Sequence, residues 1–361
     1  NRGLAFGKGD VLSVSGEYGV INQIAFQGRS FAGESVADYH IVGTDDIVYT
    51  KSPLKANPYG IIKVNKGIPG IVSTLYAVYH PLNTVAPRFV DLYFANDLRL
   101  NKFLKPLVNI GAKHDMKVNN SFVLTGTVVF PSISEQQKLV DFFAKLDRRI
   151  EAQRKIVDAL KKYKRGLLSY VFEEMTLSDD ADSTTYYFSE IARRRKEKYS
   201  PDSGVEYPCI ELEHIEQGTG RLLGNVSSTT QSSIKTAARS GDVLFGKLRP
   251  YLRKFAFAEQ DIVCSSEIWA FIPSEYVIPK YLYYLVQTEH FLRVANISSG
   301  TKMPRAEWAN IEKEPFDIPC ILIQEKIVSI LEAIDKKICT SGDSLRMLIN
   351  FREGLLQQLF I

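Results

Sequence analysis

Two segments of the chain carry apolar residues three, four or seven positions apart, which is the spacing of an amphipathic helix. The first covers residues 131–172 and the second covers residues 319–360. Because a heptad stripe on each of two helices lets one helix pack on the other, we expect the two stripes to form one helix–helix seam. The residues expected in this seam are Leu139, Phe143, Leu146, Ile150, Val157, Leu160, Ile327, Leu331, Ile334, Ile338, Leu345 and Leu348.

The two helical segments are copies of each other. Shifted by 188 positions, residues 131–172 align with residues 319–360 without a gap, and 12 of the 42 aligned pairs are identical. Chance would give roughly two or three identities, so the chain contains an internal duplication. Polar residues interrupt both stripes at the same places, Gln153 with Ser341 and Lys164 with Arg352. Such interruptions can fix the register of paired helices.

Local signals suggest where these helices begin and bend. Ser134 with Gln137 fits a capping box at the start of the first helix. The segment 341–344 contains Ser, Gly, Asp and Ser and could kink the second helix midway. Gly166 and Gly354 occupy matching positions, which indicates either a close approach of another backbone or a bend.

The segments between the helices also correspond, more loosely. A strand after a turn is expected at 46–51 and at 242–247, and a short amphipathic helix at 87–92 and 279–284. The segments 71–78 and 262–269 also resemble each other. The predicted fold class is therefore α+β, with two mixed strand-rich domains separated by two long, internally repeated helices that pack as an antiparallel coiled coil. The predicted ranges are domain one at 1–130, helix one at 131–175, an acidic and polar linker at 176–185, domain two at 186–318 and helix two at 319–361. About 60 residues precede Gly241-Asp242 in the second half against 45 before Asp46 in the first, so we expect an N-terminally truncated first domain.

Composition adds little to this picture. There are 45 basic and 41 acidic residues, and the net charge of +4 is too small to indicate a partner. Residues 131–172 alone carry ten basic and five acidic side chains. The four cysteines show no Cys-x-x-Cys spacing and the five histidines are scattered, so we expect neither a metal site nor a disulfide framework. Without a signal peptide or an apolar run of about 18 residues, we expect a cytoplasmic protein that crosses no membrane.

Lysine and arginine clusters in equivalent loops are candidate DNA contacts, because these side chains neutralise phosphates and arginine also reads guanine. The candidates are Lys51, Lys55, Lys63, Lys113, Lys247, Arg249, Tyr251, Arg253, Lys254 and Lys302. The cluster from Lys247 to Lys254 is denser than chance and is bounded by strand-like runs, which favours a functional role. The segment 193–196 is as dense but looks like a helix end, which fits backbone contact and plain solvation equally well. The basic residues of the first helix (Lys161, Lys162, Lys164 and Arg165) either follow DNA phosphates or form a solvated helix face.

The order of domain, long helix, domain, long helix resembles the specificity subunit of Type I restriction–modification systems. The residues that carry the resemblance are Pro131, 135–138, 146–150 and 166–168, with Pro319, 324–326, 334–338 and 354–356 in the second copy. The resemblance implies two target-recognition domains that each read half of a split double-stranded DNA target, and a helical spacer that sets the distance between the halves. It also implies methyltransferase (modification) subunits and restriction/translocase subunits as partners, which would carry S-adenosylmethionine, ATP and Mg. The chain itself would hold no cofactor or metal and perform no catalysis.

Two other interpretations compete with this one. A coiled-coil scaffold that binds only proteins would need no basic loops, and its binding would depend less on salt than phosphate contacts do. A self-contained adenine methyltransferase is suggested only by the segments 6–9 and 57–59. There the second proline and the glycine-rich turn that this enzyme needs are both missing. No Gly-x-x-x-x-Gly-Lys-Ser/Thr loop occurs, so the chain encodes no nucleotide-driven motor of that type.

Overall fold

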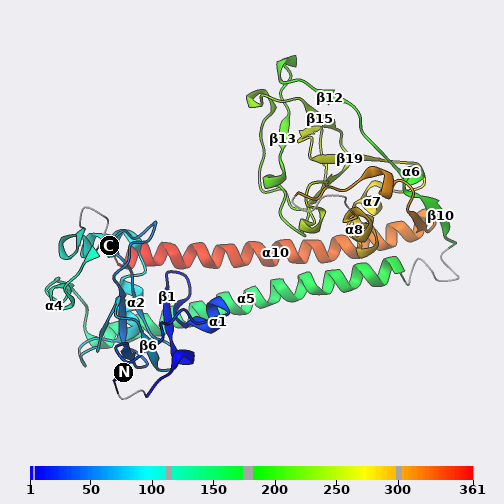
Figure 1. Cartoon of the computed structure of the whole chain (residues 1–361). Helices are drawn as coiled ribbons and strands as arrows, with labels where there is room; N and C mark the ends of the chain where they lie inside the picture. Colours follow the sequence, from blue (N-terminus) through cyan, green and yellow to red (C-terminus); the bar gives the residue numbers. More distant parts are fainter. Residues whose placement is uncertain (3–4, 111–115, 174–181, 298–302, 361) are drawn as a thin grey trace. The chain divides into compact units, whose positions relative to one another are not determined.

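The computed structural model describes residues 1–2, 5–110, 116–173, 182–297 and 303–360. The chain divides into two compact units (Figure 1). Unit 1 contains Asn1–Gln153 together with Ser344–Ile361, and unit 2 contains Arg154–Asp343. The division crosses both long helices, so each unit holds one end of each helix.

Both expected helices are present. Helix α5 covers Ile133–Glu173 and helix α10 covers Ile321–Leu359. The capping box at the start of α5 was predicted too late in the sequence. Ser132 and Glu135 form it, with the Ser132 amide donating to the Glu135 carboxylate over 3.0 Å and the Ser132 hydroxyl over 2.7 Å. Ser132 forms the box because it directly precedes the first helical residue.

Two expectations about the interior of the helices are corrected. Helix α10 continues without a break through residues 341–344, so the expected kink is absent there. A methyl group added at Gly166 or at Gly354 would meet no atom within 4 Å, so no backbone approaches either glycine closely. These glycines are not explained by packing.

The predicted seam residues face the interior to different degrees. Seven are buried: Phe143, Leu146, Ile150, Val157, Ile327, Leu331 and Ile334. The other five are half-buried: Leu139, Leu160, Ile338, Leu345 and Leu348. In unit 1, Val140 and Phe143 of α5 share a core with Leu356 and Phe360 near the end of the chain. In unit 2, Leu168 and Val171 of α5 share a core with Ile327 and Leu331 of α10. The two helices therefore pack on each other within each unit.

Unit 1 is built from short strands and helices in addition to its helix ends. Its strands are β1 Leu12–Ser15, β2 Gly19–Asn22, β3 His40–Val42, β4 Ile47–Thr50, β5 Ile62–Val64, β6 Gly70–Val72, β7 Tyr76–Tyr79, β8 Asn109–Ile110 and β9 Met116–Lys117. Its short helices are α1 Gln23–Gln27, α2 Pro87–Tyr93, α3 Asp97–Leu104 and α4 Asn120–Val123. A three-stranded antiparallel sheet in the order β5-β4-β7 lies at its centre, and β1-β2, β3-β6 and β8-β9 form separate pairs.

Unit 2 repeats this plan with more strands. Its strands are β10 Thr184–Tyr187, β11 Ala192–Arg194, β12 Lys198–Tyr199, β13 Pro208–Ile210, β14 Val226–Ser227, β15 Lys235–Ala238, β16 Val243–Gly246, β17 Phe255–Phe257, β18 Ile262–Cys264, β19 Ile268–Pro273 and β20 Pro315–Ile318. Its short helices are α6 Phe188–Ile191, α7 Pro279–Leu285, α8 Glu289–Ala295 and α9 Trp308–Ile311. The sheets have the orders β11-β19-β16-β17 and β12-β15-β18-β13-β14, with β10-β20 as a separate pair.

The expected correspondence between the two halves is visible in strand pairing. In unit 1, β4 pairs with β5 and β7, and in unit 2 β16 pairs with β17 and β19, all antiparallel. A buried aspartate precedes each central strand. Asp46 accepts a hydrogen bond from the Gly43 amide at 2.6 Å, and Asp242 accepts one from the Arg239 amide at 2.9 Å. The two halves thus share a three-stranded framework, to which unit 2 adds β11.

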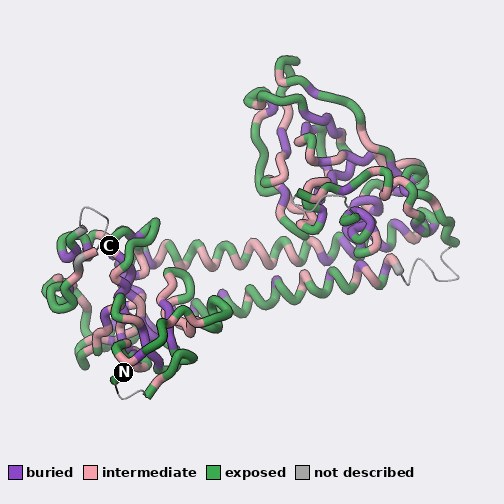
Figure 2. Tube along the Cα trace, in the orientation of Figure 1, coloured by how far each residue is buried: buried purple, intermediate pink, exposed green. Residues whose placement is uncertain are grey.

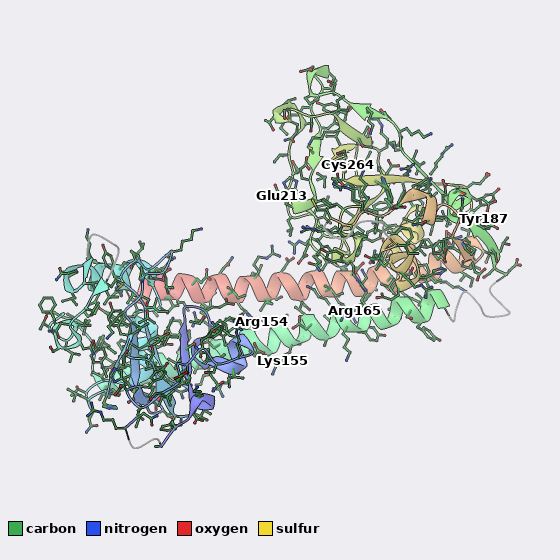
Figure 3. The ribbon with its side chains drawn as sticks, in the orientation of Figure 1. Arg154, Lys155, Arg165, Tyr187, Glu213 and Cys264 are labelled. Carbon is green, nitrogen blue, oxygen red and sulfur yellow. The ribbon has the colours of Figure 1, made fainter. Side chains whose placement is uncertain are left out.

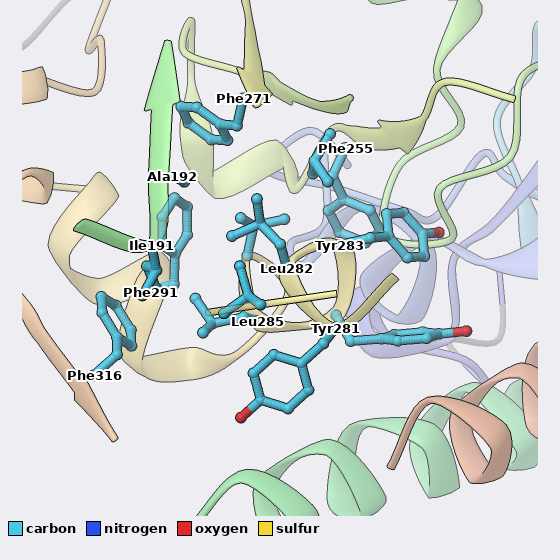
Figure 4. Close-up of a cluster of buried hydrophobic side chains, with 14 of the residues drawn as sticks. Ile191, Ala192, Phe255, Phe271, Tyr281, Leu282, Tyr283, Leu285, Phe291 and Phe316 are labelled. Atoms are coloured by element: carbon cyan, nitrogen blue, oxygen red, sulfur yellow. The ribbon is translucent and has the colours of Figure 1, made fainter. Parts of the chain in front are cut away.

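The largest core belongs to unit 2. Side chains of β16, β17, β19, α7 and α8 meet the helices α5 and α10 there (Figure 4). Phe245, Phe271, Phe291 and Tyr281 are each at most 1% exposed, and burying an aromatic side chain of this size contributes about 1.5–3 kcal/mol. Buried residues concentrate in the strands and in α7 and α8 (Figure 2). Helices α7 and α8 therefore fix the second strand-rich domain to the ends of α5 and α10 in this unit.

A buried glutamine joins each long helix to the domain beside it. The Oε1 atom of Gln136 accepts a hydrogen bond from the Ala86 amide at 2.8 Å, and its Nε2 atom donates to the carbonyls of Thr84 and Pro131. Its repeat partner Gln324 makes the equivalent three bonds, to the backbone of Ile278, Tyr276 and Pro319. Each glutamine thus holds the N-terminus of a short helix, α2 or α7, so the duplication preserves this joint.

Two of the polar interruptions of the seam, Lys164 and Arg352, form ion pairs that the same repeat relates. In unit 2, the Nζ atom of Lys164 lies 2.7 Å from Asp335, and the Tyr284 hydroxyl donates to that carboxylate at 2.9 Å. In unit 1, Arg352 donates to Asp147 over 2.5 Å. Lys164 is the repeat partner of Arg352 and Asp147 that of Asp335, so both pairs have the same antiparallel register.

Candidate nucleic-acid interface

The loop between β16 and β17, residues 247–254, is a basic segment of unit 2 whose backbone is held by hydrogen bonds to neighbouring segments. The Gly246 amide donates to the Lys254 carbonyl at 2.7 Å and closes the hairpin at its base. On the opposite side, the Arg249 amide donates to the Pro304 carbonyl at 2.8 Å, and the Ala306 amide donates to the Lys247 carbonyl at 2.9 Å. The backbone of the loop is therefore fixed from two sides.

Two arginines bend this loop with unusual backbone conformations. Arg249 has φ 52° and Arg253 has φ 50°, on either side of a single 3₁₀ turn at Pro250–Leu252. The left-handed region costs about 1–2 kcal/mol for a residue with a Cβ atom. Such strain is frequent where a loop must present particular side chains to a ligand. The turn between them presents Tyr251, whose side chain is 52% exposed.

The predicted contact residues of this loop divide into two groups. The Lys254 amine donates to the carbonyls of Leu212 at 2.6 Å and Ile215 at 3.0 Å, and Arg253 donates to both oxygens of Glu289 at 2.7 and 2.8 Å. These two cations are engaged within the fold. The side chains of the remaining three have no polar partner in the part of the chain that the structure describes: Lys247, Arg249 and Tyr251. Arg249 is exposed and Lys247 half-buried.

A cavity of about 570 Å³ in unit 2 lies between this loop and helix α5. Its lining residues come from α5, the 217–219 loop, the 247–254 loop, the start of β17, the segment between α7 and α8, the start of α8, and α10. They are Lys161, Lys164, Arg165, Leu168, Gln217, Gly218, Thr219, Tyr251, Arg253, Phe255, Gln287, Glu289, Asp335 and Ile338. The 217–219 loop is held in place by the Gly218 amide, which donates to the Arg253 carbonyl at 2.9 Å. This loop was not expected from the sequence, because it carries no basic residue.

Gly220 is required for that loop to lie where it does. Its φ is +75°, and a methyl group added there would come within 2.0 Å of the Tyr283 hydroxyl oxygen. Next to it, Arg221 forms an ion pair with Asp343 of α10 at 3.1 Å. The loop therefore passes over α7 and is fastened to the long helix.

The expected basic face of helix α5 is corrected at one position. Lys164 is only 5% exposed and belongs to the seam with Asp335, so it is not part of a solvated face. Burial lowers the pKa of Lys164, and the carboxylate of Asp335 opposes that shift. Lys161, half-buried, and Arg165, exposed, line the cavity instead, and Lys162 is exposed outside it. Figure 3 labels Arg165 on α5 with Arg154 and Lys155 of the same helix.

The candidates of the first half are more dispersed. Lys63 lies in the middle of β5, Lys51 directly follows β4, and Lys55 is exposed in the loop after it. The Lys51 amine donates to the Asn120 side chain at 3.4 Å, and burial lowers its pKa. Lys113 and Lys302 lie outside the described residues. The ten predicted contacts stay predictions, of which the hairpin residues of unit 2 have the best-defined surroundings.

The dense basic segment 193–196 is largely structural. Arg195 donates to both oxygens of the buried Asp242, at 2.6 and 2.9 Å. The Arg194 guanidinium lies 5.4 Å from the ring centroid of Trp269 and 4.6 Å from that of Trp308. These contacts fix β11 against the central sheet. Arg193 and Arg194 form the end of this strand, which begins at Ala192 directly after helix α6 ends at Ile191.

The described residues offer no metal cluster and no membrane span. Among them, no three His, Cys, Asp or Glu side chains are grouped so that they could hold a metal ion. None of the described helices combines the length and apolar character needed to cross a membrane.

Residues 185–343 match the family model described as the Type I restriction modification DNA specificity domain. The chain is 27% identical over 197 residues to the Type I restriction enzyme HindI specificity subunit of Haemophilus influenzae, covering 50% of this chain and 41% of that protein. It is also 27% identical over 153 residues to the EcoDI specificity subunit of Escherichia coli, covering 41% of this chain and 33% of that protein. The matches span less than half the length of either curated relative. The resemblance to specificity subunits is confirmed.

Solved structures share the fold. A chain from a structural study of complex assembly and conformational transition of the type I R-M system has a TM-score of 0.54 at 16% identity, covering 91% of this chain and 84% of that chain. The Type-I restriction-modification system S subunit from M. genitalium has a TM-score of 0.53 at 13% identity, covering 100% of this chain and 91% of that chain. At these identities the likeness concerns the fold alone.

Proposed function

Because the DNA specificity domain match falls within unit 2, we propose that this chain is the specificity subunit of a Type I restriction–modification complex. In this role it binds a bipartite double-stranded DNA target and performs no catalysis. The observation that carries the proposal is the joint repeated by Gln136 and Gln324, which fastens two similar frameworks with different loops to one duplicated helix pair. Such a design suits two readers held at a fixed separation.

The 247–254 hairpin of unit 2 is the proposed reader of one half-site. Arg249 and Tyr251 are exposed on a backbone that is fixed from both sides, and an ordered loop loses little entropy on binding. Arginine can bond guanine in the major groove, and tyrosine can stack on or pack against bases. In the first half, Lys51, Lys55, Lys63 and Lys113 are the proposed counterparts, with Lys302 added in the second.

The two long helices are proposed to pair along their length as an antiparallel coiled coil that sets the gap between half-sites. Joining the readers makes the second half-site contact intramolecular, so the affinity for the joined target exceeds that for either half. The common register of the pairs Lys164–Asp335 and Arg352–Asp147 supports this arrangement.

Modification subunits are proposed to dock on exposed apolar side chains of the two long helices. Large apolar side chains one or two heptads apart are exposed on α5, namely Phe142, Ile156, Tyr163 and Tyr170, which are 44–61% exposed. Ile330 and Phe351 of α10, the repeat partners of Phe142 and Tyr163, are exposed as well. Exposed apolar rows of this kind mark protein contacts. S-adenosylmethionine, ATP and Mg would belong to the partner subunits, and the complex would work in the cytoplasm.

The test is co-expression of the chain with the proteins encoded beside its gene, followed by purification and mapping of methylated bases in the host genome. We expect methyltransferase subunits to co-purify and one split motif to be methylated. Replacing Ile156 and Tyr163 by lysine should abolish co-purification, whereas Lys162→Gln on the same helix should not. If no methyltransferase binds and no split motif is methylated, a protein-only scaffold becomes the better account.

A further inference from the structure

The cavity between helix α5 and the 247–254 loop is lined by more cationic than anionic side chains. Four cations line it, Lys161, Lys164, Arg165 and Arg253, together with the two carboxylates of Glu289 and Asp335. Both carboxylates are already paired: Glu289 bonds Arg253 at 2.7 Å, and Asp335 lies 2.7 Å from Lys164. Two of the four cations are therefore left without a carboxylate partner in the cavity.

The remaining two are Lys161 and Arg165. Neither has a hydrogen-bond or ion-pair partner among the residues that the structure describes. They are four residues apart on α5 and so lie on the same face of the helix, one turn from each other. Two cations at this spacing repel each other weakly, and a bound anion would relieve that repulsion.

The internal repeat shows that helix packing does not need these charges. The positions equivalent to Lys161 and Arg165 on α10 are Ile349 and Glu353. Both helices pack in the same register, yet only α5 carries the two cations. Packing between the two helices therefore does not account for these cations. Their position in the same cavity as Tyr251 points to a ligand instead.

We propose that this cavity binds phosphates of the DNA backbone, with Lys161 and Arg165 of helix α5 as direct contacts beside the reading loop. The inference rests on the proposed function and extends it, since the helix is then part of the DNA-binding surface and not only a spacer. These contacts are independent of base sequence. They fix the position of the duplex against Tyr251 and Arg249, which carry the sequence dependence. The equivalent positions on α10, Ile349 and Glu353, carry no cation, so only α5 contributes these contacts to the DNA phosphates.

The experiment measures DNA binding of the full chain, with any modification subunits that co-purify, over a range of salt concentrations. One labelled duplex carries the methylated motif of the host genome and the other carries an unrelated sequence. For Lys161→Gln/Arg165→Gln, the slope of log affinity against log salt should fall by about two, at about 0.9 for each phosphate that the protein no longer neutralises. Raising salt from about 50 to about 200 mM should then weaken the variant about tenfold less than the wild type. Both duplexes should be affected alike, and the methylated motif should not change.

Lys162→Gln is the matched control, because Lys162 is an exposed lysine of the same helix outside the cavity. The inference is wrong if the double variant and this control have the same salt slope. Inorganic phosphate is the second probe. If it stabilises the wild type but not the double variant against heat while the DNA slope is unchanged, the cavity binds a free anion instead. A wild-type complex that shows no preference for its own motif would contradict the proposed function itself, which the salt slope of the variant does not decide.

Discussion

Arg249 combines two properties that are rarely found in one residue: an exposed guanidinium and a left-handed backbone conformation. The backbone cost is local, whereas the proposed benefit of the charge is realised only when DNA is bound. The two can therefore be separated by substitution, since glycine removes both the strain and the charge while glutamine removes the charge alone.

Arg249→Gly should raise the free energy of unfolding by up to about 1 kcal/mol, because relief of strain exceeds the extra freedom of glycine in the unfolded chain. Arg249→Gln should give no such gain. Both variants should bind the target duplex more weakly. Urea unfolding and DNA titration check these outcomes. Two variants of equal stability would show that the loop is not strained at this residue.

The four cysteines differ in exposure and therefore in reactivity. Burial raises the pKa of the Cys209 thiol to about 11 and that of the Cys264 thiol to about 12, so both stay protonated near neutral pH. Cys320 and Cys339 are exposed. Because the thiolate is the nucleophile, a thiol reagent at a pH of about 7.5 should label only the two exposed cysteines rapidly in the native chain and all of them after denaturation. Intact mass measured over time checks this. Rapid labelling of Cys264 would contradict the buried position.

Sequence reasoning succeeded for residues whose neighbours follow from periodicity and failed for those whose partners are distant in the chain. Lys254 looks like a surface cation between two strands. Its carbonyl partners, Leu212 and Ile215, lie about 40 positions away and cannot be found by pattern. Lys164 looked like part of a basic face, although its match with Arg352 already marked it as a seam residue.

At the scale of elements, the long helices were predictable because a 3.6-residue period repeated over 42 positions is a strong signal. The three-stranded framework was predictable where the two halves could be compared, as for β4 and β16. The parallel pairing of β13 with β18 was not, since it joins strands about 50 residues apart that share no turn. The cavity was not predictable either, because its lining residues come from segments that are far apart in the sequence.

The two seam ion pairs provide a matched comparison within one molecule. The side chains of Lys164 and Asp335 are 6% and 27% exposed, against 28% and 48% for Arg352 and Asp147. A double-mutant cycle should give a coupling of about 0.2–1 kcal/mol for the exposed pair. For the buried pair, removing Asp335 alone should cost about 3–5 kcal/mol, because it leaves a buried charge without a partner.

The pH dependence of the buried pair follows from the same burial. Since the pKa of Lys164 is lowered from its ordinary value of 10.5, the unfolded chain holds the proton more tightly than the folded one. This residue therefore costs stability at neutral pH, and the cost is relieved as the pH rises toward 10.5. Lys164→Met/Asp335→Leu should be about as stable as the wild type near neutral pH and should lose this part of the alkaline gain. Unfolding curves at pH values of about 7 and about 9.5 check both statements.

At the scale of the whole molecule, the proposed spacer makes a quantitative prediction. Residues 152–158 and 341–347 face each other if the proposed coiled coil keeps the register of the two ion pairs throughout. Removing both segments then shortens the helix pair by about 10 Å. At about 3.4 Å per base pair, the gap in the methylated motif should shorten by about three base pairs while both half-sites stay the same. Methylation mapping in a host that expresses the variant measures the gap. An unchanged gap would show that the helices do not set it.

The division into units has a consequence for how the chain is made. Unit 1 contains residues 1–153 but is completed only by residues 344–361, which supply Leu356 and Phe360 to the core around Phe89 and Phe143. At about 5–20 residues per second, a ribosome needs roughly 10–40 s to make the intervening chain. Unit 2, which is continuous in sequence, can fold during that time. Until then, unit 1 keeps part of its apolar core uncovered, so the nascent chain exposes apolar surface that the finished fold covers.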